Sequence, residues 1–215
     1  KESEKDKYIK EDSTGKLRNI TSSEYYTFAE LALIILYVST TVGESIIKEK
    51  ELKTINRIRL SKAKESNILF SKLSLGFLVA VIQILIVYIY SSLVLKVDWG
   101  ENTLKFLAIF IVFGIFVSSL GLIFGMLCKK ESSLSGILNA IIIVMCILGG
   151  CYTPISIIIQ IPILNKLMVI SPVYWINTAI SSMLCSIKTN AYYISLIIPL
   201  TLSIIMLVIS LLLGK

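Results

Sequence analysis

The stretch Leu104–Leu127 reads LKFLAIFIVFGIFVSSLGLIFGML, and its single charge is on Lys105. A transmembrane helix needs about 20 mainly apolar residues, because each residue rises about 1.5 Å and the hydrocarbon core is about 30 Å thick. The whole chain has the same character: 55% of its 215 residues are hydrophobic and 16% are charged, against about 25% charged in an ordinary soluble domain. We therefore expect an all-α polytopic membrane protein.

Four further apolar stretches are long enough to cross a bilayer, so a bundle of five transmembrane helices is predicted. The predicted spans are about residues 25–42, 68–95, 104–127, 134–151 and 192–213. Residues 152–190 are also largely apolar, but Gln160, Pro162, Lys166 and Pro172 interrupt them. Pieces this short suit outer re-entrant or interfacial helices better than a full span.

The charged residues gather between the spans and set the expected orientation. Residues 44–67 carry seven Lys/Arg and four Glu, whereas the loops of the other side hold few basic residues. Because cytoplasmic loops are enriched in Lys and Arg, we assign residues 44–67 to the cytoplasm and residues 1–24 to the outside. This accounts for the net charge of +7 without a nucleic-acid partner. Five spans place the two termini on opposite faces, so we expect residues 1–24 to be the extracellular tail of a missing N-terminal segment that holds a sixth span.

The loop after the first predicted span is the most informative segment. Residues 44–58 read ESIIKEKELKTINRI. On a helix lying along the membrane, Ile46, Ile47, Ile55 and Ile58 would form an apolar edge, with the charges facing the cytosol. The alternative is a solvated positive-inside loop, which composition alone favours. The position straight after a span, together with the length, favours a docking element.

Residues 49–58, EKELKTINRI, resemble the pattern E-R/K-E-x-G-T-x-x-R-L of the ABC type-2 permeases, the membrane subunits of ATP-binding-cassette exporters. Lys53 stands where that family has Gly, and Ser71-Lys72 is similar to the G-K that opens the next span. Three later patches also resemble the family: residues 118–125 (SSLGLIFG), 149–154 (GGCYTP) and 171–175 (SPVYW). The four patches occur in the family's order, within about residues 25–215.

The resemblance implies a transport subunit and not an enzyme. It implies a path between two permease copies or homologues, which moves a drug, peptide, lipid or polymer outward across a bacterial cytoplasmic membrane. The sequence has no Walker A glycine loop, so a partner ABC ATPase would bind ATP and Mg²⁺, and no cofactor is expected in this chain. The implied residues for coupling to the ATPase are Glu44, Glu49, Lys50, Glu51, Thr54 and Arg57. Those of the outer exit motif are Gly149, Gly150, Pro154, Ser171 and Pro172.

Two further groups of residues stand out within the spans. Small side chains at helical spacing, which let two helices approach closely, occur at Gly114, Ser118, Gly121 and Gly125. We prefer packing within the chain to a contact between subunits. Candidates for the transport path or its gate are Glu30, Gln83 and Asn139. The alternatives are contact of Glu30 with water or headgroups, and bridging of helices by the two amides.

Several rival functions remain open from the sequence. A channel or secondary transporter would be expected to have facing broken helices or charges deep in the spans, and only Glu30 offers such a charge. An intramembrane enzyme needs a nucleophile with a base or a metal cluster, but the chain has no histidine. A membrane anchor that only holds an ATPase is equally compatible. The four cysteines lack CxxC spacing, which disfavours a metal site, and a disulfide between Cys151 and Cys185 is an open option.

Overall fold

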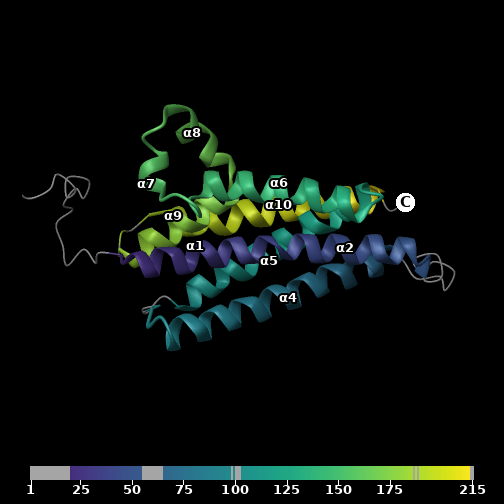
Figure 1. The fold of residues 1–215 in the computed structure, drawn as a ribbon, viewed down its shortest axis with the longest axis horizontal. Helices are drawn as coiled ribbons and strands as arrows, with labels where there is room; N and C mark the ends of the chain where they lie inside the picture. The colour runs from purple at the N-terminus through teal and green to yellow at the C-terminus, as the bar shows by residue number, and fades with distance from the viewer. Residues whose placement is uncertain are drawn as a thin grey trace, which may run out of the picture.

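The computed structural model describes residues 20–54, 65–97, 99, 103–185, 187 and 189–213, and every element in these ranges is a helix. In chain order these are α1 (Ser22–Leu36), α2 (Val38–Glu51), α4 (Glu65–Leu93), α5 (Thr103–Leu127), α6 (Glu131–Gly149), α7 (Ile155–Ile158), α8 (Pro162–Leu167), the 3-10 helix η2 (Met168–Ile170), α9 (Pro172–Leu184) and α10 (Ala191–Leu213). Five helices are long and apolar enough to cross a membrane: α1 with α2, α4, α5, α6 and α10. The predicted all-α polytopic fold is confirmed, and Figure 1 shows these helices running side by side.

The first span is one helix of 30 residues, Ser22–Glu51, with a turn at Tyr37 between α1 and α2. A capping box fixes its start: the Thr21 hydroxyl accepts from the backbone N–H of Glu24, and the Glu24 carboxylate accepts from the N–H of Thr21. At about 1.5 Å per residue the helix is about 45 Å long, which exceeds a hydrocarbon core of about 30 Å. The last turns of α2 therefore extend beyond the bilayer.

Helix α2 includes the first part of the segment, residues 44–51, that was expected to form a helix lying along the membrane. The predicted span ended at Val42, but the helix continues to Glu51. Ile46 and Ile47 are buried in the core, and Ile46 packs near Gly125 of α5. Lys and Glu are good helix formers, so the charged residues prolong the helix beyond the span, while the isoleucines hold it against the bundle. Ile55 and Ile58 lie outside the described residues.

Helix α5 is the centre of the bundle. In its most apolar stretch 72% of the residues are buried, against 17% in α4 and in α10. Helices α2, α4 and α10 pack around it. The small residues of α5 allow two close approaches: a Cβ added to Gly121 would lie 2.2 Å from the carbonyl oxygen of Ser39, and one added to Gly114 would lie 2.8 Å from the Cβ of Ala80. All these contacts are made within the chain.

An aromatic cluster closes one end of the bundle. Phe28 of α1 stacks edge-on against Trp99, with ring centroids 4.7 Å apart, and lies 5.2 Å from Phe106 of α5. Tyr88 of α4 also contacts Trp99, with ring centroids 5.0 Å apart. The indole N–H of Trp99 donates to the hydroxyl of Ser91 at 3.0 Å, so the buried polar atom of the ring is satisfied. The cluster joins α1, α4 and α5 where the chain turns between α4 and α5.

The segment between α6 and α10 begins and ends at the same end of the bundle as the aromatic cluster (Figure 1). The helix pair Pro162–Ile170 and Pro172–Leu184 is bent by 95° at Ser171. Helices α7 and α8 stand away from the bundle in Figure 1, whereas α9 packs against α1, α6 and α10. A sharp bend between two short helices, with both ends of the segment at one end of the bundle, is the arrangement expected of the predicted re-entrant segment. We call this end the re-entrant end, and the opposite one, where α2 ends, the charged end.

Candidate functional site

Four polar residues in the last turns of α2, namely Glu44, Lys48, Glu49 and Lys50, reach three other helices. We call them the α2-end cluster. The Glu49 carboxylate forms an ion pair with the ammonium group of Lys72 in α4. The two side chains are 29% and 10% exposed, so water screens the pair little. The second oxygen of Glu49, Oε2, is buried and has no partner among the described residues.

Lys50 connects α2 to the end of α5. Its ammonium group donates to the carbonyl oxygens of Gly125 at 2.9 Å and of Met126 at 2.8 Å. The last carbonyls of a helix have no partner within the helix and carry the negative end of its dipole. Lys50 therefore supplies both the hydrogen bonds and the positive charge that the end of α5 lacks.

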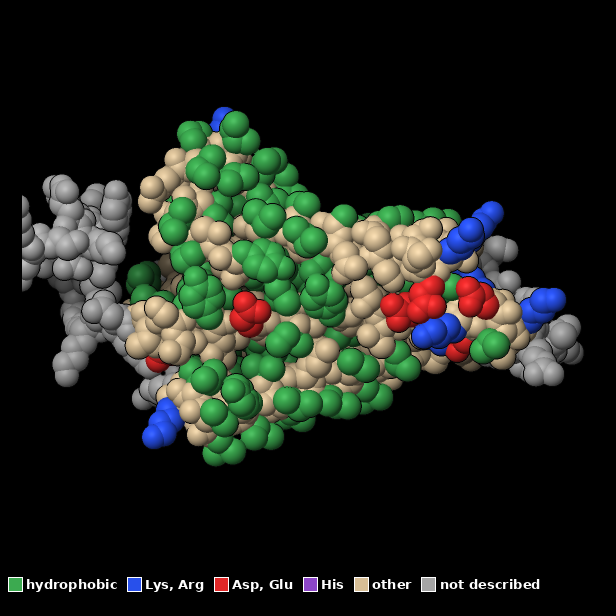
Figure 2. Space-filling view, in the orientation of Figure 1, with side chains coloured by type: hydrophobic (Ala, Val, Ile, Leu, Met, Phe, Trp, Pro, Cys, Tyr) green, Lys and Arg blue, Asp and Glu red, His purple; other side chains and the backbone are tan. Residues whose placement is uncertain are grey.

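The contacts of the cluster with α6 are weaker. The hydroxyl of Ser135 lies 3.5 Å from Glu44 Oε1, and Lys48 Nζ lies 3.6 Å from Glu131 Oε1. The Lys48 and Glu131 side chains are both exposed, and such a pair contributes about 0–1 kcal/mol. The cluster as a whole links the end of α2 to α4, α5 and α6. Figure 2 shows charged side chains of both signs gathered at this end, beyond a mainly hydrophobic surface.

Helix α2 ends in a conformation that favours glycine. Leu52 is the C-cap, and Lys53, which follows it, has φ = 55°. A helix commonly ends with a left-handed residue at this position, usually Gly. The hydroxyl of Thr54 donates to the carbonyl oxygen of Glu49 at 3.1 Å and adds a partner for the helix end. Glu51 and Leu52 are exposed, and Arg57 lies outside the described residues.

At the re-entrant end, side chains from α1 and α9 hold the loop that follows α6. Gly150 ends α6 with φ = 84° and its carbonyl oxygen accepts from the Tyr25 hydroxyl at 2.8 Å. The backbone N–H of Ile155, at the start of α7, donates back to Tyr25 at 3.3 Å. Asn177 Nδ2 donates to the carbonyl oxygen of Gly149 at 2.7 Å. The Ser171 hydroxyl donates to Met145 one turn further into α6, at 3.0 Å.

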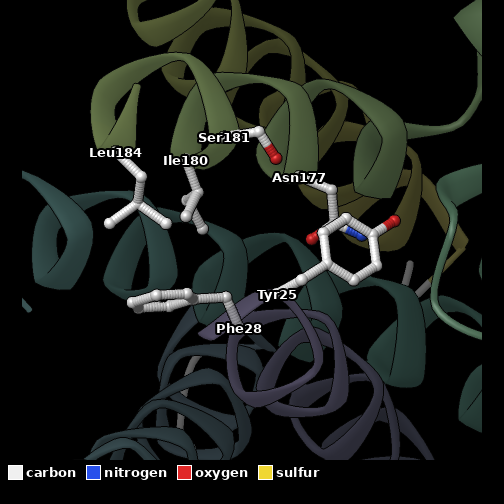
Figure 3. Close-up of a pocket in the computed structure, with 6 residues that line it drawn as sticks. All are labelled: Tyr25, Phe28, Asn177, Ile180, Ser181 and Leu184. Carbon is white, nitrogen blue, oxygen red and sulfur yellow. The ribbon is translucent and has the colours of Figure 1, made fainter. Parts of the chain in front are cut away.

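A small cavity lies between α1 and α9 beside these hydrogen bonds. Figure 3 shows Tyr25 and Phe28 facing the side chains of α9 that line it. The lining residues are Tyr25, Phe28, Asn177, Ile180, Ser181 and Leu184. Its volume of about 10 Å³ is room for about one water molecule, so it is no binding pocket for a transported molecule. Gly149 allows this packing, because a Cβ there would lie 2.4 Å from Val173 of α9.

Comparison with known families shows to which class of protein this helical bundle belongs. The chain matches the family described as ABC-2 family transporter protein over residues 2–214. This protein belongs to the ABC-2 transporter family. The resemblance seen in the sequence is thereby confirmed, and the chain is a multi-pass membrane subunit of the transporter class and not an enzyme of its own. Comparisons with curated proteins and with solved structures gave no match.

The structure of this ABC-2 protein brings some of the sequence candidates together and separates others. The coupling candidates Glu44, Glu49, Lys50, Glu51 and Thr54 share the charged end. The exit-motif residues share the re-entrant end, where Pro154 precedes α7 and Pro172 opens α9. The path candidates lie on three different helices: Glu30 on α1, Gln83 on α4 and Asn139 on α6. The cysteines carry free thiols, so Cys151 and Cys185 form no disulfide in this structure.

Several residues of this ABC-2 permease were missed from the sequence. Lys72 was noted only as part of a family pattern, although a lysine within the first turns of a span needs an acidic partner. Asn177 was overlooked in the broken apolar region, and Tyr25 entered only as the start of the first predicted span. No sequence signal pairs Tyr25 with Gly150, because their separation of 125 residues is bridged only by the fold.

Proposed function

We propose that this chain is the permease subunit of an ATP-driven exporter, and that a separate ATPase subunit docks at the charged end of α2. The supporting observation is that the α2-end cluster contacts α4, α5 and α6. A force applied to the end of α2 therefore acts on three further spans at once. Rigid-body shifts of packed helices are an ordinary means of transmitting such a change.

The exposed tip of α2 is the part available to a partner. Glu51 and Leu52 are exposed, and Lys53 turns the chain away from the helix axis. An exposed leucine beside charges of both signs is the composition expected of a small docking surface. The excess of Lys and Arg in residues 44–67 supports a cytoplasmic location for this tip, where ATP is present.

Two permease copies or homologues would enclose the transport path, and their closing ATPase subunits would bind ATP and Mg²⁺. The cargo would leave outward across a bacterial cytoplasmic membrane. In this scheme Glu49, Lys50 and Glu44 transmit the movement within the permease. Glu51 and Thr54, at the tip of α2, would contact the ATPase, and the family pattern adds Arg57 as a further candidate for this contact.

The decisive experiment is isolation of the protein from its native membrane in mild detergent, with identification of co-purifying subunits and an ATPase assay on the same sample. Glu51→Lys is the informative variant, because this exposed side chain contributes little to the bundle. We expect an ATPase subunit with the unaltered protein and loss of that subunit with Glu51→Lys.

Lys105→Glu is the matched control, since it reverses one exposed charge at the re-entrant end and should leave the association intact. A stable assembly without ATPase activity would instead favour a channel or secondary transporter. An ATPase that stays bound and active in the Glu51→Lys variant, with transport unchanged, would remove α2 from the coupling role.

A further inference from the structure

One face of the first span carries polar and aromatic side chains, interrupted at the half-buried Leu33 and Ile34. The residues follow each other at helical spacing, so that they share this face, and most of them are exposed. We call them the polar stripe: Tyr26, Glu30, Tyr37, Thr41, Glu44 and Lys48. The opposite face of the same helix is buried and apolar, with Phe28, Leu31, Ile35 and Val42 in the core. A spanning helix that turns a polar face away from its own bundle needs that face to be covered by something other than lipid tails.

Glu30 is the only acidic residue of this stripe in its apolar part. It lies about one helical turn, roughly 6 Å, deeper than Tyr26. Figure 2 shows an acidic side chain among hydrophobic ones on the face formed by α1. The carboxylate has no hydrogen bond or ion pair with any described residue, and the next basic residue of its own helix is Lys48, at the charged end. Helix α6, which packs beside α1, carries no basic residue.

Tyrosine side chains lie on the same face as Glu30, on both sides of it along the helix. Tyr26 and Tyr37 precede and follow it on the stripe, and both are exposed. Tyr152, just after α6, is exposed as well. The pKa of the Tyr152 phenol is raised, chiefly by desolvation and further by nearby acidic groups that include Tyr37 and Glu30. Tyr152 directly follows α6, the helix that packs beside α1. An unpaired carboxylate among tyrosine rings is the chemistry that recognises organic cations, through charge and cation–π attraction.

We propose that the polar stripe lines the transport path and that Glu30, with Tyr26, Tyr37 and Tyr152, selects amphiphilic organic cations as cargo. The inference rests on the proposed transport function, since it assumes that cargo reaches this face. A bare metal ion fits the site less well, because hard cations need several oxygen ligands and Glu30 offers the only carboxylate here. A large cation with apolar substituents is matched instead by the exposed rings of Tyr26, Tyr37 and Tyr152.

The test is equilibrium binding of tetraphenylphosphonium to the purified full-length permease in nanodiscs, with tetraphenylborate as an anion of matched size and shape. We expect tetraphenylphosphonium to bind at least about tenfold more weakly to Glu30→Gln, because one close charge pair is lost. Glu30→Asp should retain most of the binding. Tetraphenylborate should bind no less well to Glu30→Gln than to the unaltered protein. Folding is not at issue, because the change is isosteric and the side chain is exposed.

Two further variants separate the tyrosines from general hydrophobicity. Tyr37→Leu should weaken tetraphenylphosphonium binding several-fold through loss of the cation–π contact. Tyr193→Leu, on the exposed side of α10, is the matched control and should leave it unchanged. Equal binding of the cation to the unaltered protein and to Glu30→Gln would overturn the proposal. So would loss of association between two permease copies in Glu30→Gln with cation binding intact, because the stripe would then be a protein interface.

The cation-binding result can contradict the cargo proposal and still leave the proposed transport function intact. Binding to the permease requires no ATPase, whereas the Glu51→Lys experiment reports on ATPase docking and not on cargo. An ATPase that co-purifies with a permease indifferent to Glu30→Gln would retain the exporter and discard the cation selectivity.

Discussion

Lys50 of α2 donates to the carbonyl oxygen of Gly125 at 2.9 Å, although the two residues are 75 positions apart. The contact is made where a helix end would otherwise leave carbonyls unpaired. Next to Lys50 in the chain, Glu49 forms its ion pair with Lys72 of α4. Two consecutive side chains of α2 thus hold two different spans. In the proposed exporter, these two contacts would transmit a movement of α2 to α4 and α5.

Removing the Lys50 ammonium group should loosen the end of α5. Lys50→Met keeps the length of the side chain. We expect it to lower the free energy of unfolding by about 1–2 kcal/mol, because two charge-assisted hydrogen bonds and a favourable dipole interaction disappear. The midpoint of thermal unfolding in detergent measures this effect. Lys50→Arg should retain most of the stability, since the guanidinium group can still donate to both carbonyls. An unfolding midpoint in Lys50→Met equal to that of the unaltered protein would show that water replaces the lysine at no cost.

The Glu49–Lys72 pair should behave as a unit. Glu49→Gln leaves the buried ammonium group of Lys72 without a counter-charge. We expect this to lower the free energy of unfolding by about 2–3 kcal/mol. Lys72→Met should cost a similar amount, because the partly buried carboxylate is then unpaired. The double variant Glu49→Gln with Lys72→Met should lose less than the sum of the two single variants.

A double-mutant cycle on unfolding midpoints gives this coupling directly. Strict additivity of the two single changes would mean that the ion pair contributes nothing beyond its separate side chains.

The sequence predicted the number of spans well, because apolar length is a local property. Leu104–Leu127 could be assigned as a span without any knowledge of its neighbours. The continuation of the first span through Glu49 could not, since a run of Lys and Glu fits a soluble loop and an extended helix equally. That choice is made by burial of Ile46 and Ile47 against α5, which is a tertiary effect.

The candidate site shows the same division. Glu49 and Lys50 stood out as charges after a span, and both are at the end of α2. Their partners Lys72 and Gly125 did not stand out, because pairing depends on which helices are adjacent. The family pattern contributed one local detail: the position of Lys53, where the family has Gly, has the positive φ that glycine favours. The sequence motif thus carried backbone information that neither composition nor hydropathy contains.

Replacing Lys53 by the residue of the family pattern should stabilise the protein. A non-glycine residue in the left-handed conformation costs about 1 kcal/mol or more, and Lys53 has φ = 55°. We expect Lys53→Gly to raise stability by somewhat less than this, because glycine also gains freedom in the unfolded chain. Lys53→Ala is the control and should give no gain, as it keeps the Cβ. The unfolding midpoint is the measurement, and a lower midpoint in Lys53→Gly than in Lys53→Ala would contradict the left-handed conformation.

Gly121 should be the least replaceable glycine of the bundle. An alanine there would place its Cβ 2.2 Å from the carbonyl oxygen of Ser39, which is backbone and cannot rotate away. Helices α5 and α2 would have to separate, and overpacking of this kind costs about 1–3 kcal/mol or more. Gly136→Ala on α6 is the matched control, because no atom beyond the neighbouring residues and backbone of its own helix lies within 4 Å of the added Cβ. That change should stabilise α6 by up to about 1 kcal/mol, since alanine is the better helix former.

Gly121→Ala and Gly136→Ala each add one methyl group. The first should lower the unfolding midpoint and the second should raise it. Because α2 carries the proposed docking tip, Gly121→Ala should also reduce transport in native-membrane vesicles, while Gly136→Ala should not. Similar midpoints for the two variants would show that α2 and α5 are not in the close contact on which the coupling proposal depends.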